Sequence, residues 1–79
     1  MKPETAFGLA LKTARSSKGF TQEQLALNSN LDRTFISMLE RGQRQPSLTS
    51  ILSISESLNI PAYELIRQTM EIMDKNNKS

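Results

Sequence analysis

The 79-residue sequence contains no cysteine and no histidine. Without cysteine the chain can form neither disulfides nor thiolate metal sites. Without histidine it lacks the usual general base at neutral pH and the commonest protein ligand for metal ions. Asp and Glu side chains could still exchange protons, but no glycine-rich phosphate loop or nucleophile motif accompanies them. The composition therefore argues against an enzyme, and we expect no metal and no other cofactor.

Long apolar runs are also missing, since the longest contain two or three residues. A membrane-spanning helix needs about 20 predominantly apolar residues, so none is expected. The N-terminal stretch MKPETAFGLALK lacks the uninterrupted apolar region and the small-residue cleavage site of a signal peptide. We therefore expect a soluble cytoplasmic protein with no membrane partner.

The charge is small but unevenly distributed along the chain, whose formal net charge is +2. Residues 1–44 contain seven Lys/Arg against four Asp/Glu, whereas residues 45–79 contain three against four. The positive excess therefore lies in the first half of the chain. Such a distribution is compatible with an anionic partner.

The apolar residues that are present recur at three- and four-residue spacing, and no Asn-Gly or Asp-Gly hairpin turn interrupts them. This pattern predicts an all-α fold class. We expect five helices with short connections, at about 4–18, 21–29, 32–41, 47–58 and 62–75. The length predicts one compact domain over residues 1–79, and the last residues, DKNNKS, are expected to fray.

Two of these helices are short and closely spaced. Thr21, followed three residues later by Gln24, has the spacing of a capping box and predicts a helix start. Asn30 can adopt a left-handed conformation and turn the chain sharply, and Asp32 can cap the next helix. Gly42 marks the end of that helix. The sequence therefore predicts a helix-turn-helix at about 21–41.

The second of these helices, LDRTFISMLERG, has two different faces. Phe35, Ile36 and Leu39 can form one apolar face against a core. The other face is left pointing away from any core, and it carries Arg33, Thr34, Ser37 and Met38.

The stretch TQEQLALNSNLDRTFISMLERGQRQPSL resembles the DNA-binding domain of lambda-repressor-like, Cro-type (XRE) regulators. The similarity extends from about residue 7 to residue 65, through the segments GFTQEQLA, ERG and PSL. Within this family, LDRTFIS followed by ERGQRQPSL is most similar to the controller proteins of restriction–modification systems. The resemblance implies a transcription regulator that binds a (pseudo)palindromic operator in double-stranded DNA as a homodimer, without a small-molecule ligand.

The resemblance also implies which residues contact DNA, because helix-turn-helix proteins of this family place their second helix in the major groove. Arg33 could donate two hydrogen bonds to guanine O6 and N7. Phe35 stands where relatives often have Tyr, and for it a packing role remains equally open. The implied base contacts are Arg33, Thr34, Ser37, Met38 and Phe35, and the implied backbone contacts are Thr21, Gln22, Gln43, Arg44 and Arg41.

Two further expectations concern structure and assembly. The resemblance implies an ion pair between Arg15 and Glu40. Residues 62–75 are a candidate dimerisation helix, because apolar stripes run along it and the four preceding helices are expected to close the core. The expected interface residues are Tyr63, Leu65, Ile66, Thr69, Met70 and Met73.

Alternative functions remain open at this point. A phage-type repressor and an antitoxin are alternatives with the same DNA-binding fold. A helical protein-interaction module without DNA binding belongs to a different class, since a fold does not guarantee a function. Arg33, Gln22 and Arg44 distinguish these classes, because an interaction module has no need for this polar set on one face.

Overall fold

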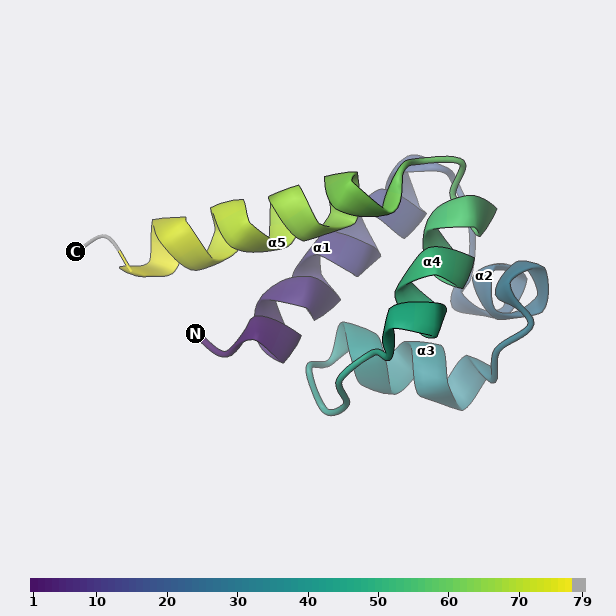
Figure 1. The fold of residues 1–79 in the computed structure, drawn as a ribbon. Helices are drawn as coiled ribbons and strands as arrows, with labels where there is room; N and C mark the ends of the chain where they lie inside the picture. Colours follow the sequence, from purple (N-terminus) through teal and green to yellow (C-terminus); the bar gives the residue numbers. More distant parts are fainter. Residues whose placement is uncertain (78–79) are drawn as a thin grey trace.

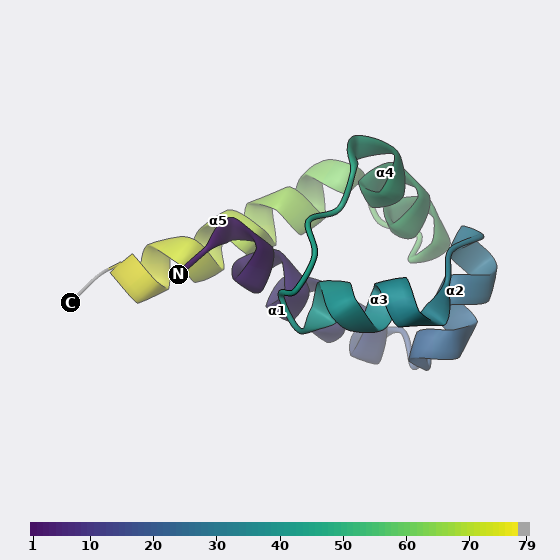
Figure 2. The same cartoon turned by 90° about the horizontal axis from the view of Figure 1, so that it is seen from below.

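The computed structural model describes residues 1–77, which form five helices and no strand. These are α1 (Pro3–Ser17), α2 (Gln22–Ser29), α3 (Arg33–Glu40), α4 (Leu48–Ser57) and α5 (Ala62–Asn77). The all-α prediction is therefore confirmed. Helices α1 and α5 lie side by side in opposite directions, and α2, α3 and α4 gather at one end of this pair (Figures 1 and 2). None of the described helices is long and apolar enough to cross a membrane.

The predicted helix ends are largely confirmed. The capping box of α2 is complete, because the Gln24 N–H donates to Thr21 Oγ1 at 3.0 Å and the Thr21 N–H donates to Gln24 Oε1 at 2.8 Å. Asn30 has a φ of 56° and ends α2 in the left-handed conformation that the sequence suggested. Asp32 occupies the N-cap position of α3, but its side chain makes no capping hydrogen bond. Its negative charge still lies at the positive end of the helix dipole.

The C-terminal helix is longer than expected. The sequence predicted a helix to about residue 75 that frays over DKNNKS, yet α5 continues to Asn77. The half-buried side chains of Ile72 and Met73 and a hydrogen bond from Asn76 Nδ2 to Ile72 O support this last part. The expected fraying of residues 78 and 79 lies outside the described residues.

All five helices contribute to one core, which corrects the expectation that four helices close it without the fifth. Leu65 of α5 is fully buried, and Thr69 is buried with its hydroxyl donating to Leu65 O at 2.7 Å. Because α5 packs along α1, these two residues face the interior of the chain, which leaves little of their surface for the dimer contacts predicted for them. The core side chains are Phe7, Leu11, Leu25, Ala26, Ile36, Leu39, Ile54, Leu58 and Leu65.

Gly8 allows α1 and α3 to cross at very short distance, a feature that the sequence did not reveal. A Cβ atom at this position would lie 2.4 Å from Leu39 O and 2.7 Å from Glu40 O. A glycine inside a helix costs about 1 kcal/mol relative to alanine. Here it is required, because any side chain would push the C-terminal end of α3 away from α1.

Candidate nucleic-acid interface

The outer face of α3 carries the side chains predicted to read bases. Ile36 and Leu39 point into the core, whereas Arg33 and Thr34 are exposed in the first turn. Ser37 and Met38 lie one turn further along and are half-buried. Helix α3 itself lies at the surface of the molecule (Figure 2). The four residues therefore share a face from which they can reach a groove of DNA.

Phe35 differs from these four residues. Its half-buried side chain packs against the hydrophobic core. The guanidinium of Arg44, from the loop after α3, lies over the ring, with Cζ 5.5 Å from the ring centroid. The packing role that the sequence left open is therefore present, and Phe35 also meets a residue predicted to contact the DNA backbone.

The residues predicted to contact the DNA backbone come from two segments. Thr21 and Gln22 lie at the start of α2, and Arg41, Gln43 and Arg44 follow α3. The structure brings the two segments together, because Gln22 Nε2 donates to Glu40 Oε1 at 3.0 Å, one residue before Arg41. A single strand of DNA lying along α3 could contact both segments.

The predicted ion pair between Arg15 and Glu40 is present. Arg15 donates from Nε to Glu40 Oε2 at 2.6 Å and from Nη2 to Oε1 at 3.1 Å. Its Nη1 donates to Phe20 O at 2.7 Å, so all three guanidinium nitrogens are used. The two side chains are only 13% and 3% exposed. This bidentate pair joins α1 to α3 and to the loop before α2.

Gln22 has a structural contact that the sequence did not reveal. Its amide group completes the hydrogen bonding of the Glu40 carboxylate, in addition to the two bonds from Arg15. One amide N–H of Gln22 remains for a phosphate, as do the main-chain N–H groups of Gln22 and Glu23, which have no partner among residues 1–77. Phosphates bind well at such helix N-termini.

The segment formed by α3 and the loop after it carries an excess of positive charge. Residues 32–44 contain three arginines and two acids, and one of these acids, Glu40, is compensated by Arg15. Within residues 1–77, the guanidinium groups of Arg33, Arg41 and Arg44 make no ion pair or hydrogen bond. They remain available for an anionic partner. Residues 1–77 contain no group of three or more Asp or Glu side chains that could hold a metal ion.

A short helix-turn-helix with an outward polar helix, and with arginines that make no ion pair within residues 1–77, is typical of DNA-binding proteins of the helix-turn-helix class. The chain belongs to the XRE-type helix-turn-helix family HTH_3, whose model matches residues 11–65. It is accordingly a DNA-binding regulator, and the predicted resemblance to this family is confirmed.

Individual relatives support the narrower resemblance to controller proteins. The control protein C.BamHI of Bacillus amyloliquefaciens is 41% identical over 61 residues, which cover 76% of this chain and 75% of that protein. The restriction-modification controller protein C.AhdI of Aeromonas hydrophila is 44% identical, with a TM-score of 0.77 over 78% of this chain and 94% of the other. The controller protein C.Esp1396I, solved as a tetramer in complex with its natural 35 base-pair operator, is 32% identical. Its TM-score is 0.81 over 91% of this chain and 95% of that one.

Proposed function

We propose that the protein is a sequence-specific transcription regulator that binds a (pseudo)palindromic operator as a homodimer in the cytoplasm. We further propose that it is the controller protein of a restriction–modification system. The observation that carries the proposal is the outer face of α3, where Arg33 and Thr34 are exposed and Arg33 has no ion-pair partner within residues 1–77. The similarity to C.BamHI and C.AhdI favours a controller over a phage-type repressor or an antitoxin.

In this proposal the first turns of α3 enter the major groove. Arg33 reads a guanine through O6 and N7, Thr34 and Ser37 reach a base or a nearby phosphate, and Met38 offers apolar contact to a thymine methyl group. The backbone contacts are made by Thr21, Gln22, Arg41, Gln43 and Arg44. These contacts fix the position of the protein on the duplex and add little sequence information.

A single domain of this kind covers one half-site, so useful specificity needs a second copy. Exposed apolar side chains on α5 provide the proposed interface, since Tyr63 is 74% and Met70 is 59% exposed and Ile66 lies between them on the same stripe. Met73, one turn beyond Met70, is half-buried and continues this stripe. Of the six interface residues predicted from the sequence, these four remain in the proposal.

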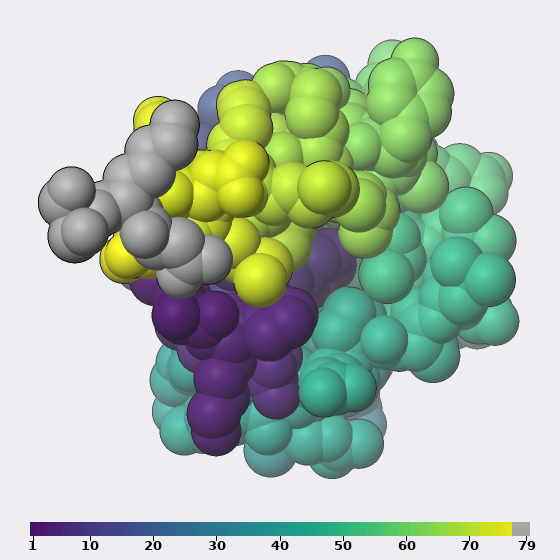
Figure 3. All heavy atoms as spheres, turned by 60° about the vertical axis from the view of Figure 1, so that its left-hand side comes forward, coloured from purple at the N-terminus to yellow at the C-terminus, as the bar shows by residue number. Residues whose placement is uncertain are grey.

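Helix α4 extends this proposed interface, which the sequence did not reveal. Leu48 and Leu52 are exposed one turn apart on α4. A hollow of about 340 Å³ lies between the two helices, lined by Ile51 of α4 and by Ile66 and Thr69 of α5. The start of α1 and the loop before α4 complete its lining with Pro3, Glu4, Phe7, Gln45 and Pro46. Figure 3 shows this side of the molecule, where the start of α1, helix α5 and the segment leading into α4 meet. Together they form a larger apolar surface than α5 alone.

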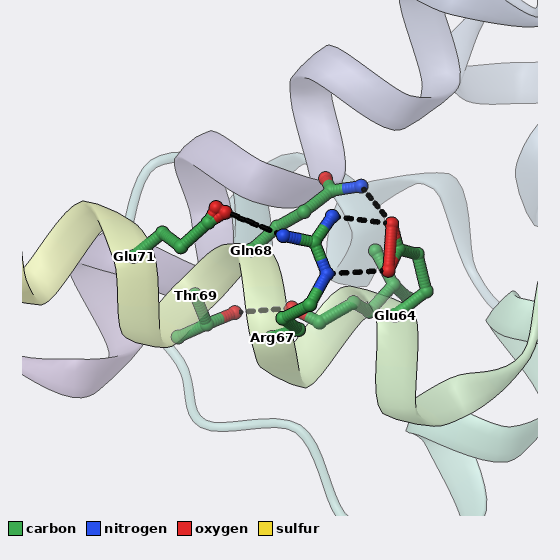
Figure 4. Close-up of polar contacts among 6 residues, drawn as sticks. Glu64, Arg67, Gln68, Thr69 and Glu71 are labelled. Carbon is green, nitrogen blue, oxygen red and sulfur yellow. Dashed lines mark hydrogen bonds and ion pairs between the residues drawn. The ribbon is translucent and has the colours of Figure 1, made fainter.

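Glu64, Arg67 and Glu71 form a polar stripe on α5 (Figure 4), and each follows directly in the sequence a residue of the apolar stripe. Arg67 donates from Nε and Nη2 to the two carboxylate oxygens of Glu64, at 2.7 and 2.6 Å, and from Nη1 to Glu71 Oε2 at 2.9 Å. The three side chains are at least partly exposed. An apolar strip beside ordered polar groups is the usual arrangement of an interface core and its rim.

The test is selection of binding sequences from a random duplex DNA pool, with the selected duplexes retested at two salt concentrations against Arg33→Ala. We expect a two-fold symmetric consensus whose preference for one guanine in each half-site is lost in the variant. Finding that sequence upstream of the protein's own gene and of an adjacent restriction gene would support the controller assignment. Weak binding without a consensus, unaffected by Arg33→Ala, would contradict the proposed function.

A further inference from the structure

The side chain of Arg44 lies over one residue of α3, Phe35. Its guanidinium makes no hydrogen bond or ion pair within residues 1–77, and its contact is the ring of Phe35, 5.5 Å from Cζ to the ring centroid. A cation over an aromatic ring is attracted by the negative face of the π-system. This attraction needs none of the guanidinium N–H donors, so all of them remain available for a ligand.

The main chain brings Arg44 to this place. The Gly42 N–H donates to Leu39 O at 3.1 Å and the Gln43 N–H donates to Met38 O at 2.9 Å, so the loop after α3 stays attached to the helix up to the residue before Arg44. Gly42 has a φ of 73°, and a Cβ atom on it would lie only 3.0 Å from the Cα of Thr5. Beyond this point the side chain of Arg44 extends over the ring of Phe35.

Phe35 is itself fixed, because its side chain packs against the core cluster of the protein. One part of the ring is therefore covered by the core, and a face is covered by Arg44. Such a ring is a poor candidate for direct contact with a base. It can instead support the long and flexible side chain of Arg44. A side chain that is already held in place before binding loses less rotamer entropy when the ligand binds.

We propose that Phe35 is a positioning residue that holds the Arg44 guanidinium ready for a phosphate of the operator backbone. This inference rests on the proposed function, because it assigns a partner to Arg44 in the DNA complex. It replaces a base-reading role for Phe35 with an indirect one. Phe35 then raises the affinity for any duplex, and the sequence preference is set by the exposed residues of α3.

A double-mutant cycle tests this coupling. The variants are Phe35→Leu, Arg44→Ala, the double variant, and Phe35→Tyr as the matched control that keeps the ring. Leucine is chosen because it keeps an apolar side chain against the core, and thermal melting verifies that each variant is folded. The probes are the duplex that the selection recovers and a duplex of the same length with a scrambled sequence.

We expect Phe35→Leu to weaken binding of both duplexes about two- to fivefold, the size of an exposed cation–π interaction. In the Arg44→Ala background the same substitution should change the affinity by less than about 1.5-fold, since no cation remains to be held. Phe35→Tyr should stay within about twofold of the parent protein. Arg44→Ala should reduce the slope of log affinity against log salt by about one, as expected for one lost phosphate contact.

Two results would overturn the inference. The first is an equal loss on Phe35→Leu with and without Arg44, and the second is a changed consensus in the selection with Phe35→Leu, which would mean direct base reading. Failure of the proposed function gives a different pattern, in which the parent protein yields no consensus. In that case the mutant cycle is measured on the scrambled duplex alone. If the parent protein binds no duplex at all, both proposals are overturned.

Discussion

The Glu40 carboxylate receives three hydrogen bonds from two other helices and is almost completely removed from solvent. Removing its charge leaves the Arg15 guanidinium partly buried without a counter-ion. Breaking a buried pair in this way typically costs about 3–5 kcal/mol. We expect Glu40→Gln to lower the free energy of unfolding by about 3 kcal/mol in urea titrations. Glu23→Gln, at an exposed position of α2, is the control, and a loss no larger than that of the control would contradict the structural role.

Gly8 carries the second prediction at this scale. Alanine would be the better helix former, yet its Cβ would meet two main-chain carbonyl oxygens of α3 at 2.4 and 2.7 Å. We expect Gly8→Ala to destabilise the fold by about 1–3 kcal/mol, as overpacking does, despite the gain in helix propensity. Thermal and urea unfolding measure this change, with Thr13→Ala at an exposed position of α1 as the control. An increase in stability would show that the two helices can separate without cost.

Residues such as these mark the limit of sequence-based prediction. The ends of α2 were predictable because the partners in its capping box are three residues apart. The bond from Gln22 to Glu40 joins residues 18 apart, and no local spacing indicates it. The close approach of Gly8 to the carbonyls of α3 likewise exists only after the helices have packed. Contacts between helices therefore had to come from the structure or, for Arg15 and Glu40, from resemblance to a family.

At the scale of the helix, α5 shows why an apolar pattern can be assigned to the wrong partner. After Ala62, its apolar residues occur at positions 63, 65, 66, 70, 72 and 73, with Thr69 among them, and thus cover more than one face. Periodicity indicates that such a helix has an apolar stripe, but not which part of it meets α1. Leu65 and Thr69 turn inward, whereas Tyr63, Ile66 and Met70 remain outside.

The ion pairs of α5 predict a dependence of stability on pH. The hydrogen bonds from Arg67 lower the pKa of Glu64 from 4.5 to about 2, against a smaller opposing effect of desolvation. Because the pKa is lower in the folded chain, the ion pair contributes its full stabilisation above pH 4.5 and loses it as the pH falls toward 2. The effect is small, since both side chains are partly exposed to solvent.

We therefore expect Glu64→Gln to lower the melting temperature at about pH 6 and to have a much smaller effect near about pH 2. Thermal melts across this range measure the difference between the variant and the parent protein. In an Arg67→Gln background the substitution of Glu64 should lose most of this effect, because the partner that lowers the pKa of Glu64 is absent. A difference that persists unchanged at the acidic end of the range would rule out the ion pair as its source.

At the scale of the whole molecule, the proposed base-reading face of α3 and the proposed dimer surface lie on different elements. Helix α3 presents its outer face at the end of the molecule where α2 and α4 gather, and the apolar stripe of α5 runs along the α1–α5 pair (Figure 1). Mutations can therefore separate dimerisation from DNA contact. This separation is useful, because affinity for an operator with two half-sites depends on both.

We expect Met70→Glu to convert the protein to monomers without unfolding it, because Met70 is exposed and a charge in the centre of an apolar interface is costly. Binding to a duplex with two half-sites should fall by about tenfold or more, while binding to one half-site should stay within about twofold. Sedimentation velocity gives the oligomeric state, and titration of the two duplexes gives the affinities. Leu27→Glu is the matched control, since Leu27 is also open to solvent but lies on α2, which does not pack against α5. If Leu27→Glu dissociates the protein and Met70→Glu does not, the dimer interface lies at α2 and the proposal that α5 forms it is wrong.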